Sequence, residues 1–223
     1  MKIAVITGAS SGMGMETAIQ LADRFGGKLD EIWLIARRRE RMEVLNGHVP
    51  VSLRFFPMDI TDRIQLERLK IELETIRPKV IFLVNAAGFG KIGKIGSLPL
   101  EAEMGMVQLN AQALLTVTHL VLPYMAKNGR IIQYASAAAF LPQPGFAIYA
   151  ATKAFVLSYS RGLNTELKGR GICVTAVCPG PVKTEFFDIA ESTGKIPLYK
   201  RLAMADPTKV VKQAIEDSIM GKS

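Results

Sequence analysis

Tyr149 and Lys153 are the side chains of this sequence with the clearest capacity for chemistry. They stand four positions apart in a segment with helical periodicity, so both leave one face of the helix a turn apart. A phenol can exchange a proton with a reacting group, but its ordinary pKa, near 10, is high for exchange at neutral pH. A cation about 4 Å away, in an effective dielectric of about 20, supplies about 4 kcal/mol, enough to lower that pKa by about 3. The pair predicts proton transfer by a phenol whose pKa is lowered by its ammonium neighbour.

A glycine-rich turn follows the first apolar run, Ile3 to Ile6. It reads Thr7-Gly8-Ala9-Ser10-Ser11-Gly12-Met13-Gly14 and leads into a helical pattern. Its glycines permit a tight turn and bring backbone N–H groups close to a pyrophosphate, which the helix N-terminus also attracts. The spacing differs from the commoner G-x-G-x-x-G, and a strand-to-helix turn without a ligand is the alternative. The turn predicts a dinucleotide-phosphate site.

Two arginines stand where a second predicted strand ends, in Ile35-Ala36-Arg37-Arg38. An NAD site carries an acid at this point to bind the ribose 2′-hydroxyl, whereas guanidinium groups suit a 2′-phosphate. The alternative is a solvated, basic start to a helix. The sequence therefore favours NADP(H) as cofactor, with NAD(H) as the second choice.

The alternation of strand-length and helix-period segments predicts parallel βαβ units. The predicted strands are Ile3 to Ile6, Glu31 to Ile35, Val51 to Phe56, Val80 to Val84, Arg130 to Tyr134 and Ile172 to Val177. The predicted helices are Gly14 to Phe25, Arg38 to Leu45, Arg63 to Ile76, Leu100 to Ala126, Ala147 to Lys168 and Thr208 to Met220. We expect one α/β domain over residues 1–223, a doubly wound Rossmann fold of about six parallel strands with helices on both faces. Ligands then bind beyond the carboxyl ends of the strands.

Charge and composition narrow the classes of partner. The formal charge of +8 raises nucleic acid as a partner. Its densest basic cluster, Arg37 to Arg41, lies at one junction without interleaved aromatic residues, so a local phosphate site is the simpler explanation and no nucleic-acid partner is expected. The most apolar stretch, Ala113 to Ala126, is interrupted by polar residues and falls short of the ~20 residues of a membrane span. We expect no membrane span.

Cysteine and histidine are too sparse for a cross-linked or metal-stabilised fold. Cys173 and Cys178 lie within one apolar segment, where a strand would hold them too far apart to bridge. We expect two thiols in a reducing cytoplasm. The two histidines show no ligand spacing, so no metal is expected.

Further polar residues follow the predicted strands. Ser136 follows the fifth strand, Asn110 lies in the long helix after the fourth, and Asn85-Ala86-Ala87-Gly88 ends the fourth. With Tyr149 and Lys153, and with the glycine turn, these residues resemble the short-chain dehydrogenase/reductase family in its short single-domain branch. The resemblance runs from Met1 to about Thr184, and the interval of 13 positions from Ser136 to Tyr149 is usual for the family.

The resemblance implies an NADP-dependent oxidoreductase that acts on a carbonyl or secondary alcohol. Its catalytic residues would be Tyr149 as general acid/base, Ser136 as donor to the substrate oxygen, Lys153 on the nicotinamide ribose, and Asn110 holding a helix kink and a water. Its cofactor contacts would be Tyr149, Lys153, Thr7, Gly8, Ser10, Ser11, Gly12, Met13, Gly14, Arg37, Arg38, Asp59, Ile60, Asn85, Ala86, Ala87, Gly88, Pro179, Gly180, Val182 and Thr184. A non-catalytic NADP(H)-binding regulator or sensor of the same fold is the alternative, against which the complete set of four catalytic residues argues.

The C-terminal part departs from the family pattern. Residues 185–206 are rich in apolar side chains and occupy the position of a substrate lid, which favours an apolar or aromatic carbonyl; surface helices that bury these side chains in the core are the alternative. The edge strand that most relatives carry after the last helix is lacking. We therefore expect a homodimer joined by the helices around Ala111 to Met125 and Tyr149 to Lys168.

Overall fold

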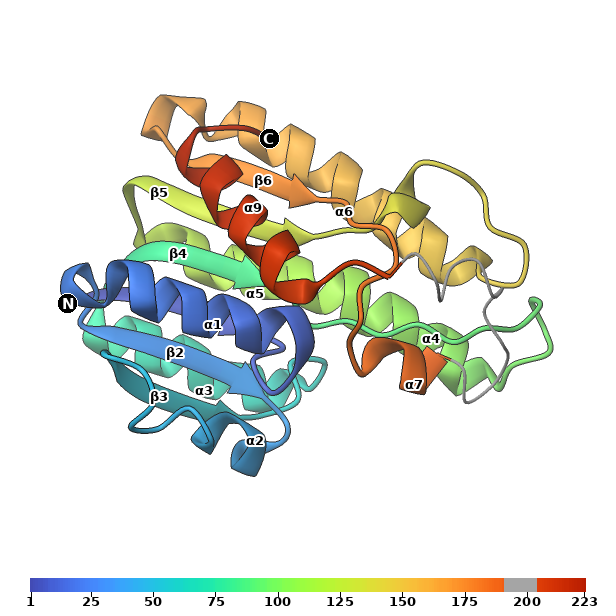
Figure 1. Ribbon diagram of the computed structural model, residues 1–223, viewed down its shortest axis with the longest axis horizontal. Coiled ribbons are helices and arrows are strands. Elements are labelled where there is room, and N and C mark those ends of the chain that lie inside the picture. The colour runs from blue at the N-terminus through green and yellow to red at the C-terminus, as the bar shows by residue number, and fades with distance from the viewer. Residues whose placement is uncertain (191–203) are drawn as a thin grey trace.

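A six-stranded parallel sheet forms the centre of the computed structural model, which describes residues 1–190 and 204–223 (Figure 1). The strands are β1 (Lys2–Thr7), β2 (Glu31–Ala36), β3 (Ser52–Pro57), β4 (Lys79–Asn85), β5 (Met125–Tyr134) and β6 (Cys173–Val177). Their order in the sheet is β3-β2-β1-β4-β5-β6. The chain runs outward from β1 to one edge, returns, and then builds the other half, so the order reverses between β1 and β4. The doubly wound Rossmann fold expected from the sequence is confirmed.

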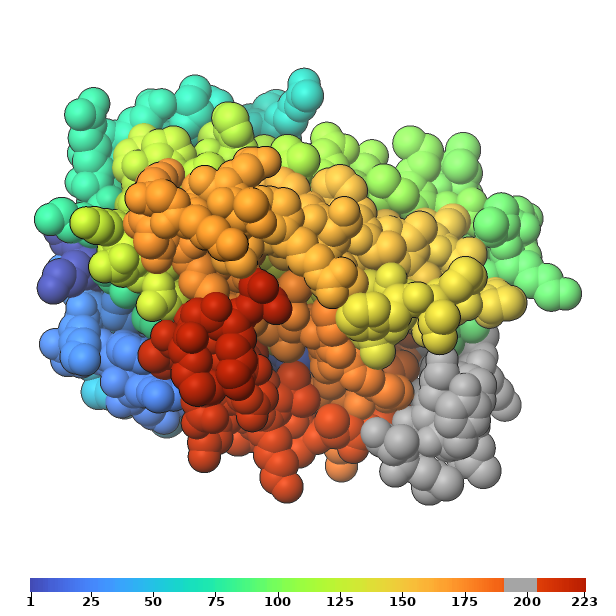
Figure 2. All heavy atoms as spheres, turned by 90° about the horizontal axis from the view of Figure 1, so that it is seen from above, coloured from blue at the N-terminus to red at the C-terminus, as the bar shows by residue number. Residues whose placement is uncertain are grey.

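Helices cover both faces of this sheet (Figures 1 and 2). They are α1 (Gly12–Phe25), α2 (Arg39–Glu43), α3 (Arg63–Ile76), α4 (Leu100–Val107), α5 (Leu114–Val121), α6 (Ala147–Glu166), α7 (Phe186–Ala190) and α9 (Pro207–Ile219). Side chains alternate across each strand, so Ile3 and Val5 pack with α3, α5 and α6, while Ala4 and Ile6 pack with α1, α2 and α9. This two-sided burial explains the nearly continuous apolar runs of the strands.

The strand boundaries agree with the sequence prediction within about two residues at every end but one. β5 begins at Met125 rather than Arg130. Asn128 adopts a left-handed conformation with φ of 62°, and the register with β4 shifts around it: Met125 pairs with Val80 and Arg130 with Phe82. The pair Asn128-Gly129 therefore forms an irregularity inside the strand, although its composition is typical of a turn.

The predicted helix Leu100 to Ala126 is one run of several kinds of helix. α4 passes into a π-helical segment, Gln108–Ala113, and then into α5 and a 3₁₀ turn, Leu122–Tyr124. The 25 residues Leu100–Tyr124 are long and apolar enough to cross a membrane by length and composition alone. Our expectation that the most apolar stretch is too short for a membrane span is therefore wrong about its length. Val117 and Val121 of this run are fully buried in the core against the sheet, as in the core helix of a globular fold.

The remaining expectations concern cysteine, metal and the lid. Cys173 is buried and Cys178 half-buried, and both are free thiols, as expected. Within residues 1–190 and 204–223, no group of three or more His, Cys, Asp or Glu side chains is placed to hold a metal ion. Of the expected lid at 185–206, residues 191–203 lie outside the described part of the chain. The described strands number six, and the family's further edge strand is not among them.

Candidate active site

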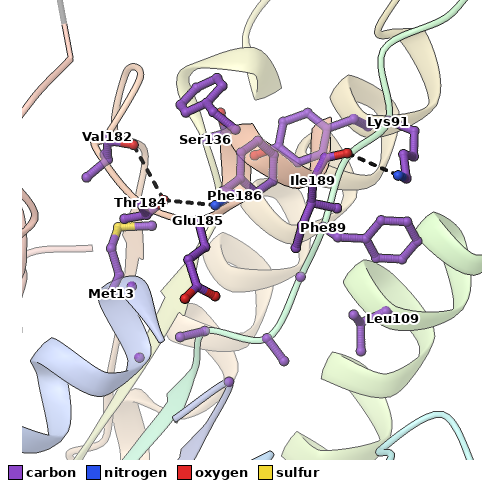
Figure 3. Close-up of a pocket in the computed structure, with 18 of the residues that line it drawn as sticks. Met13, Phe89, Lys91, Leu109, Ser136, Val182, Thr184, Glu185, Phe186 and Ile189 are labelled. Carbon is purple, nitrogen blue, oxygen red and sulfur yellow. Dashed lines mark hydrogen bonds between the residues drawn. The ribbon is translucent and has the colours of Figure 1, made fainter. Parts of the chain in front are cut away.

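One pocket of about 1080 Å³ lies at the carboxyl ends of the strands, across the point where the strand order reverses (Figure 3). It is lined by segments that follow β1, β2, β3, β4, β5 and β6 and by residues of α4–α5, α6 and α7. The expected site residues that line it are Gly8, Ser10, Ser11, Gly12, Met13, Gly14, Arg37, Arg38, Asp59, Ile60, Ala86, Ala87, Gly88, Ser136, Tyr149, Pro179, Gly180, Val182 and Thr184. The structure therefore brings residues from nearly the whole sequence to one cavity.

The backbone of the glycine turn packs closely against neighbouring backbone at two of its glycines. Gly8 has φ of 69°, and a Cβ added to it would lie 2.6 Å from the backbone nitrogen of Ala87. A Cβ on Gly14 would lie 2.3 Å from the carbonyl oxygen of Gly8. Only glycine fits at these two positions. The first turn of α1 that follows contains only glycine and methionine, so its N–H groups face the pocket without a competing carboxylate of their own turn.

Thr7 and Asn85 lie behind the pocket wall rather than in it. The Thr7 hydroxyl accepts hydrogen bonds from the backbone N–H groups of Ala86 and Ala87, at 3.2 and 3.3 Å. Asn85 donates to the Thr118 hydroxyl at 3.0 Å, and both are buried. These two residues join the ends of β1 and β4 and so fix the floor on which a nucleotide would lie.

The arginines after β2 differ in their contacts. Arg37 is exposed and lines the pocket, whereas Arg38 is directed across it. Arg38 Nη2 donates to Ser11 Oγ at 3.1 Å and to Ser10 Oγ at 3.4 Å, so it lies beside the glycine turn. From the sequence we expected the phosphate contact chiefly from Arg37, but Arg38 is the residue whose guanidinium contacts this turn. It also forms an ion pair with Glu185 at 3.0 Å.

The turn after β3 adds a polar wall at the same end of the pocket. Asp59 Oδ1 accepts hydrogen bonds from the backbone N–H and the hydroxyl of Thr61, at 2.9 and 2.7 Å. Ile60, beside it, is almost fully buried and contributes an apolar surface. An aspartate and an apolar side chain are together suited to the edge and the face of a purine ring.

Tyr149 lies in an aromatic enclosure at the other end of the pocket. Its ring stacks on Phe146 with ring centres 4.3 Å apart and packs at 5.2 Å against Phe186 of α7. Burial raises the pKa of the Tyr149 phenol to about 12, while a side-chain hydrogen bond with Ser136 opposes that rise. Ser136 itself caps the short turn after β5, accepting a hydrogen bond from the N–H of Ala138 at 3.1 Å.

Lys153 is buried one helical turn beyond Tyr149. Its Nζ donates to the carbonyl oxygen of Tyr134 at 2.7 Å and lies 5.7 Å from the centre of the Tyr149 ring. Burial lowers the pKa of this ammonium to about 8. Gly88 faces it, since a Cβ added there would lie 3.5 Å from Nζ. The Lys153 amine is therefore held under the pocket floor by a backbone carbonyl.

Our expectation that the pKa of Tyr149 is lowered is wrong, because burial raises it. A lowered pKa would require an ammonium about 4 Å from the phenol in a partly solvated site. In the structure both groups are desolvated, and desolvation disfavours the charged form of each, so the pKa of the phenol rises and that of the amine falls.

Asn110 sits in the π-helical segment and is fully buried. Its Nδ2 donates to the carbonyl oxygen of Phe89 at 2.9 Å and to Thr152 Oγ1 at 3.1 Å, and its Oδ1 accepts from the N–H of Phe89 at 3.0 Å. The side chain thus joins the long helix to the segment after β4 and to α6. Single-turn π segments often mark functional sites, and this one displaces Asn110 from regular helical pairing.

The segment after β6 closes the pocket from above. Pro179 accepts a hydrogen bond from the N–H of Ala137 at 2.8 Å, and Val182 pairs with Ala205 just before α9. Thr184 lies over the glycine turn, 3.3 Å from where a Cβ on Gly12 would be. Figure 3 shows Thr184 above Met13 and Phe186 in the same wall of the pocket.

Sequence reasoning missed several residues that shape the site. Thr152 and the carbonyl of Tyr134 hold Asn110 and Lys153, and Arg41 shares the Glu185 carboxylate with Arg38. Thr152 stands next to Lys153 in the sequence, a signal that could have been used. A contact such as Arg41 with Glu185, 144 residues apart, leaves no local pattern.

Comparisons with known proteins agree on one family. The family model of short chain dehydrogenases matches residues 2–193. The chain is 35% identical to a serine 3-dehydrogenase of Rhizobium radiobacter over 187 residues, covering 82% of this chain and 72% of that protein. It is 33% identical to sulfoacetaldehyde reductase 2 of Chromohalobacter salexigens over 190 residues, covering 82% and 74%. A short-chain dehydrogenase from Sphingobium yanoikuyae in complex with NADPH superposes with a TM-score of 0.86 at 29% identity, covering 100% and 86%.

Proposed function

Because this chain belongs to the short-chain dehydrogenase/reductase family, we propose that it transfers a hydride between NADP(H) and a carbonyl or secondary alcohol, with Tyr149 as general acid and base. The observation that carries this proposal is the position of Tyr149. Its ring is enclosed by Phe146 and Phe186 in the same pocket whose other end contains the glycine turn. A dinucleotide laid across the strand ends has room to reach from one end to the other.

The residues of the pocket fit such a dinucleotide. Gly8 and Gly14 pack closely against backbone, where a Cβ would collide, and Gly8, Gly12 and Gly14 all line the pocket. At these positions the turn presents backbone rather than side chains to a pyrophosphate. Asp59 and Ile60 would hold the adenine, Arg37 and Arg38 the 2′-phosphate, and Thr184 with the first turn of α1 the pyrophosphate. Gly88, Pro179, Gly180 and Val182 would border the nicotinamide.

NADP(H), when bound, supplies or accepts the hydride. In the direction of carbonyl reduction, the Tyr149 hydroxyl gives its proton to the substrate oxygen as negative charge develops there. The raised pKa keeps this phenol protonated over the neutral range, so the donor form is present before the substrate arrives. The Ser136 hydroxyl donates a hydrogen bond to the same oxygen and fixes its position.

Lys153 and Asn110 act from beneath the pocket floor. The Lys153 ammonium, held by Tyr134 O, would bind ribose hydroxyls above Gly88 and would stabilise a Tyr149 phenolate after proton donation. Asn110 positions this amine by holding Thr152 and Phe89, the residues that flank it on α6 and after β4. We therefore assign proton transfer to Tyr149. Asn110 and its partners behind the pocket orient the Lys153 amine.

The walls around Tyr149 favour a substrate with an apolar or aromatic part. Phe89, Phe146, Phe186 and Phe187 line this end of the pocket, together with Ile189. The related proteins named above are called a serine 3-dehydrogenase and a sulfoacetaldehyde reductase, which favours small polar carbonyl compounds. Both classes present the same reacting group to Tyr149.

A panel of ketones, aldehydes and secondary alcohols tests the proposed function. It should include aryl ketones, sulfoacetaldehyde and serine, each with NADPH or NADP⁺ and with NADH or NAD⁺, followed by nicotinamide absorbance. We expect turnover of at least one compound, faster with the phosphorylated cofactor. Absence of turnover across the whole panel, with dinucleotide bound, would instead favour a sensor.

The Arg38→Ala variant tests the cofactor preference. Loss of a charge-assisted contact with the 2′-phosphate should raise the Kd of NADPH by about 10- to 100-fold. The Kd of NADH should stay within about threefold of its wild-type value, because NADH lacks that phosphate. Calorimetric titration of both cofactors measures this difference, and Arg39→Ala is the matched control, since Arg39 pairs with Glu43 at the surface. Equal weakening of both cofactors would contradict the assignment.

We also propose a homodimer in the cytoplasm. Leu115 on α5 and Phe155 on α6 are large apolar side chains that are 42% and 40% exposed. They lie on the two helices expected to join the subunits. The free thiols of Cys173 and Cys178 suit a reducing compartment.

A further inference from the structure

The Glu185 carboxylate lies against the two arginines that follow β2. Glu185 comes directly after Thr184, in the segment that covers the pocket, and extends into the pocket from there (Figure 3). Its Oε2 pairs with Arg38 at 3.0 Å and its Oε1 with Arg41 at 3.0 Å. Each oxygen thus binds a different guanidinium group, across 147 and 144 residues of sequence.

These contacts form an anion site with an internal occupant. Arg38 Nη2 is shared between Glu185 and the hydroxyls of Ser10 and Ser11. The pKa of Glu185 is held below its ordinary value, first by the hydrogen bond with Arg38 and then by the charges of Arg38 and Arg41. Two guanidinium groups with two serine hydroxyls form the kind of site that a phosphate monoester occupies.

We infer that Glu185 competes with the 2′-phosphate of NADP(H) for Arg38 and Arg41. This inference rests on the proposed function, because it takes Arg38, which that proposal assigns to the 2′-phosphate, and adds Arg41, which shares the Glu185 carboxylate with Arg38. A phosphate monoester carries nearly two negative charges and three acceptor oxygens, against one charge and two oxygens for the carboxylate. It therefore displaces Glu185, whereas a dinucleotide without the 2′-phosphate leaves the ion pairs in place.

Displacement of Glu185 has a structural consequence at the substrate end. Glu185 is followed at once by Phe186, the first residue of α7 and a wall of the Tyr149 enclosure. The ion pairs therefore hold the start of α7 toward the β2 side of the pocket, while Lys91 Nζ and the Ile92 N–H donate to the carbonyl oxygens of Ile189 and Ala190 at its end. Exchange of the ion pairs for a phosphate removes the restraint on the start of α7 alone. Glu185 is thus a specificity-determining residue that links recognition of the phosphate to the position of the substrate wall.

The Glu185→Gln variant tests the competition through binding alone. The probes are adenosine 2′-monophosphate, adenosine 5′-monophosphate, NADPH and NADH, titrated by calorimetry at low ionic strength into the full chain. Removal of the carboxylate charge should lower the Kd of the 2′-monophosphate and of NADPH by about fivefold, because two partly exposed ion pairs no longer compete for the arginines. The Kd of the 5′-monophosphate and of NADH should change by less than about twofold. Glu43→Gln, which removes the exposed partner of Arg39, is the matched control and should leave all four unchanged.

Other outcomes overturn the inference in distinct ways. Weaker NADPH binding in Glu185→Gln would mean that the carboxylate clamps the bound cofactor, and equal tightening of NADPH and NADH would mean that it blocks the groove without regard to the phosphate. Unchanged affinities would show that the ion pairs do not compete. If the wild type binds neither dinucleotide, the proposed function fails, and the two monophosphates still decide the competition.

Hydrogen exchange provides a second measurement, made on the wild type and then on the Glu185→Gln variant. Adenosine 2′-monophosphate should increase exchange of the amides of residues 186–190, because it releases Glu185, and adenosine 5′-monophosphate should not. In Glu185→Gln these amides should exchange fast from the outset and respond to neither compound. Protection of residues 186–190 by the 2′-monophosphate would contradict the release of α7.

Discussion

Replacing Tyr149 with phenylalanine should reduce turnover by about 10²- to 10⁴-fold, the usual contribution of a positioned general acid. The substitution removes the phenol oxygen and keeps the ring, so the stacking on Phe146 and the contact with Phe186 persist. The Kd of NADPH should remain within about twofold of the wild-type value, because the proposed binding mode assigns most cofactor contacts to the glycine turn and the arginines. Steady-state kinetics on the best substrate of the panel, with calorimetry for NADPH, measure both quantities.

Tyr159→Phe is the matched control for this prediction. Tyr159 stands on the same helix α6 but packs against the core on the side of Phe155, away from the pocket lining. The turnover of the Tyr159→Phe variant should be close to that of the wild type. If Tyr149→Phe kept more than about a tenth of the wild-type turnover, the proton would have to come from another group, and Tyr149 would be a packing residue.

Replacing Lys153 with methionine should abolish most activity and stabilise the fold at neutral pH. Burial of the ammonium lowers its pKa from 10.5 to about 8, which corresponds to about 3 kcal/mol of unfavourable free energy for the charged form. Methionine fills a similar volume without this cost, although the bond to Tyr134 O is lost, so we expect a gain of about 1–3 kcal/mol at pH 7. Turnover should fall by about 10²-fold or more, because no cation remains beside Tyr149.

The stability gain of Lys153→Met should depend on pH with a definite sign. Between pH 8 and 10.5 the unfolded chain keeps the Lys153 proton that the folded chain has lost, so wild-type stability rises with pH in this range. The advantage of the variant should shrink over the same range. Urea unfolding at pH 7 and pH 10 measures the difference, and Lys168→Met, at an exposed position just after α6, should show no such trend. A constant gain would contradict burial of a charged Lys153.

Much of the fold follows from local pattern. The β-α alternation, the glycine turn and the helix Arg63–Ile76, begun by Asp62, are visible because short-range chemistry fixes them. Asp62 accepts hydrogen bonds from the N–H groups of Ile64 and Gln65, as an N-cap residue should. The spacing of Tyr149 and Lys153 likewise places both on one helical face. The order in the sheet follows from the general rule for such alternation.

Features set by distant contacts were not predictable in this way. The irregularity at Asn128 depends on pairing with β4. The ion pair between Glu185 and Arg38 depends on where β2 and β6 lie in the sheet. The sign of the Tyr149 pKa change was also wrong, because it depends on burial by Phe146 and Phe186, which the sequence does not reveal.

The pairing of Ala205 with the segment after β6 bears on the order of events during synthesis. Ala205 exchanges backbone hydrogen bonds with Pro181 and Lys183, and α9, which follows it, packs on α1 at the start of the chain. A nascent polypeptide that ends before α9 still exposes the apolar face of α1 and leaves the roof of the nucleotide groove unsupported. On the ribosome, this chain can complete the roof of its pocket only after α9 has left the exit tunnel, so a nicotinamide dinucleotide should not stabilise an earlier folding intermediate by binding to the finished site.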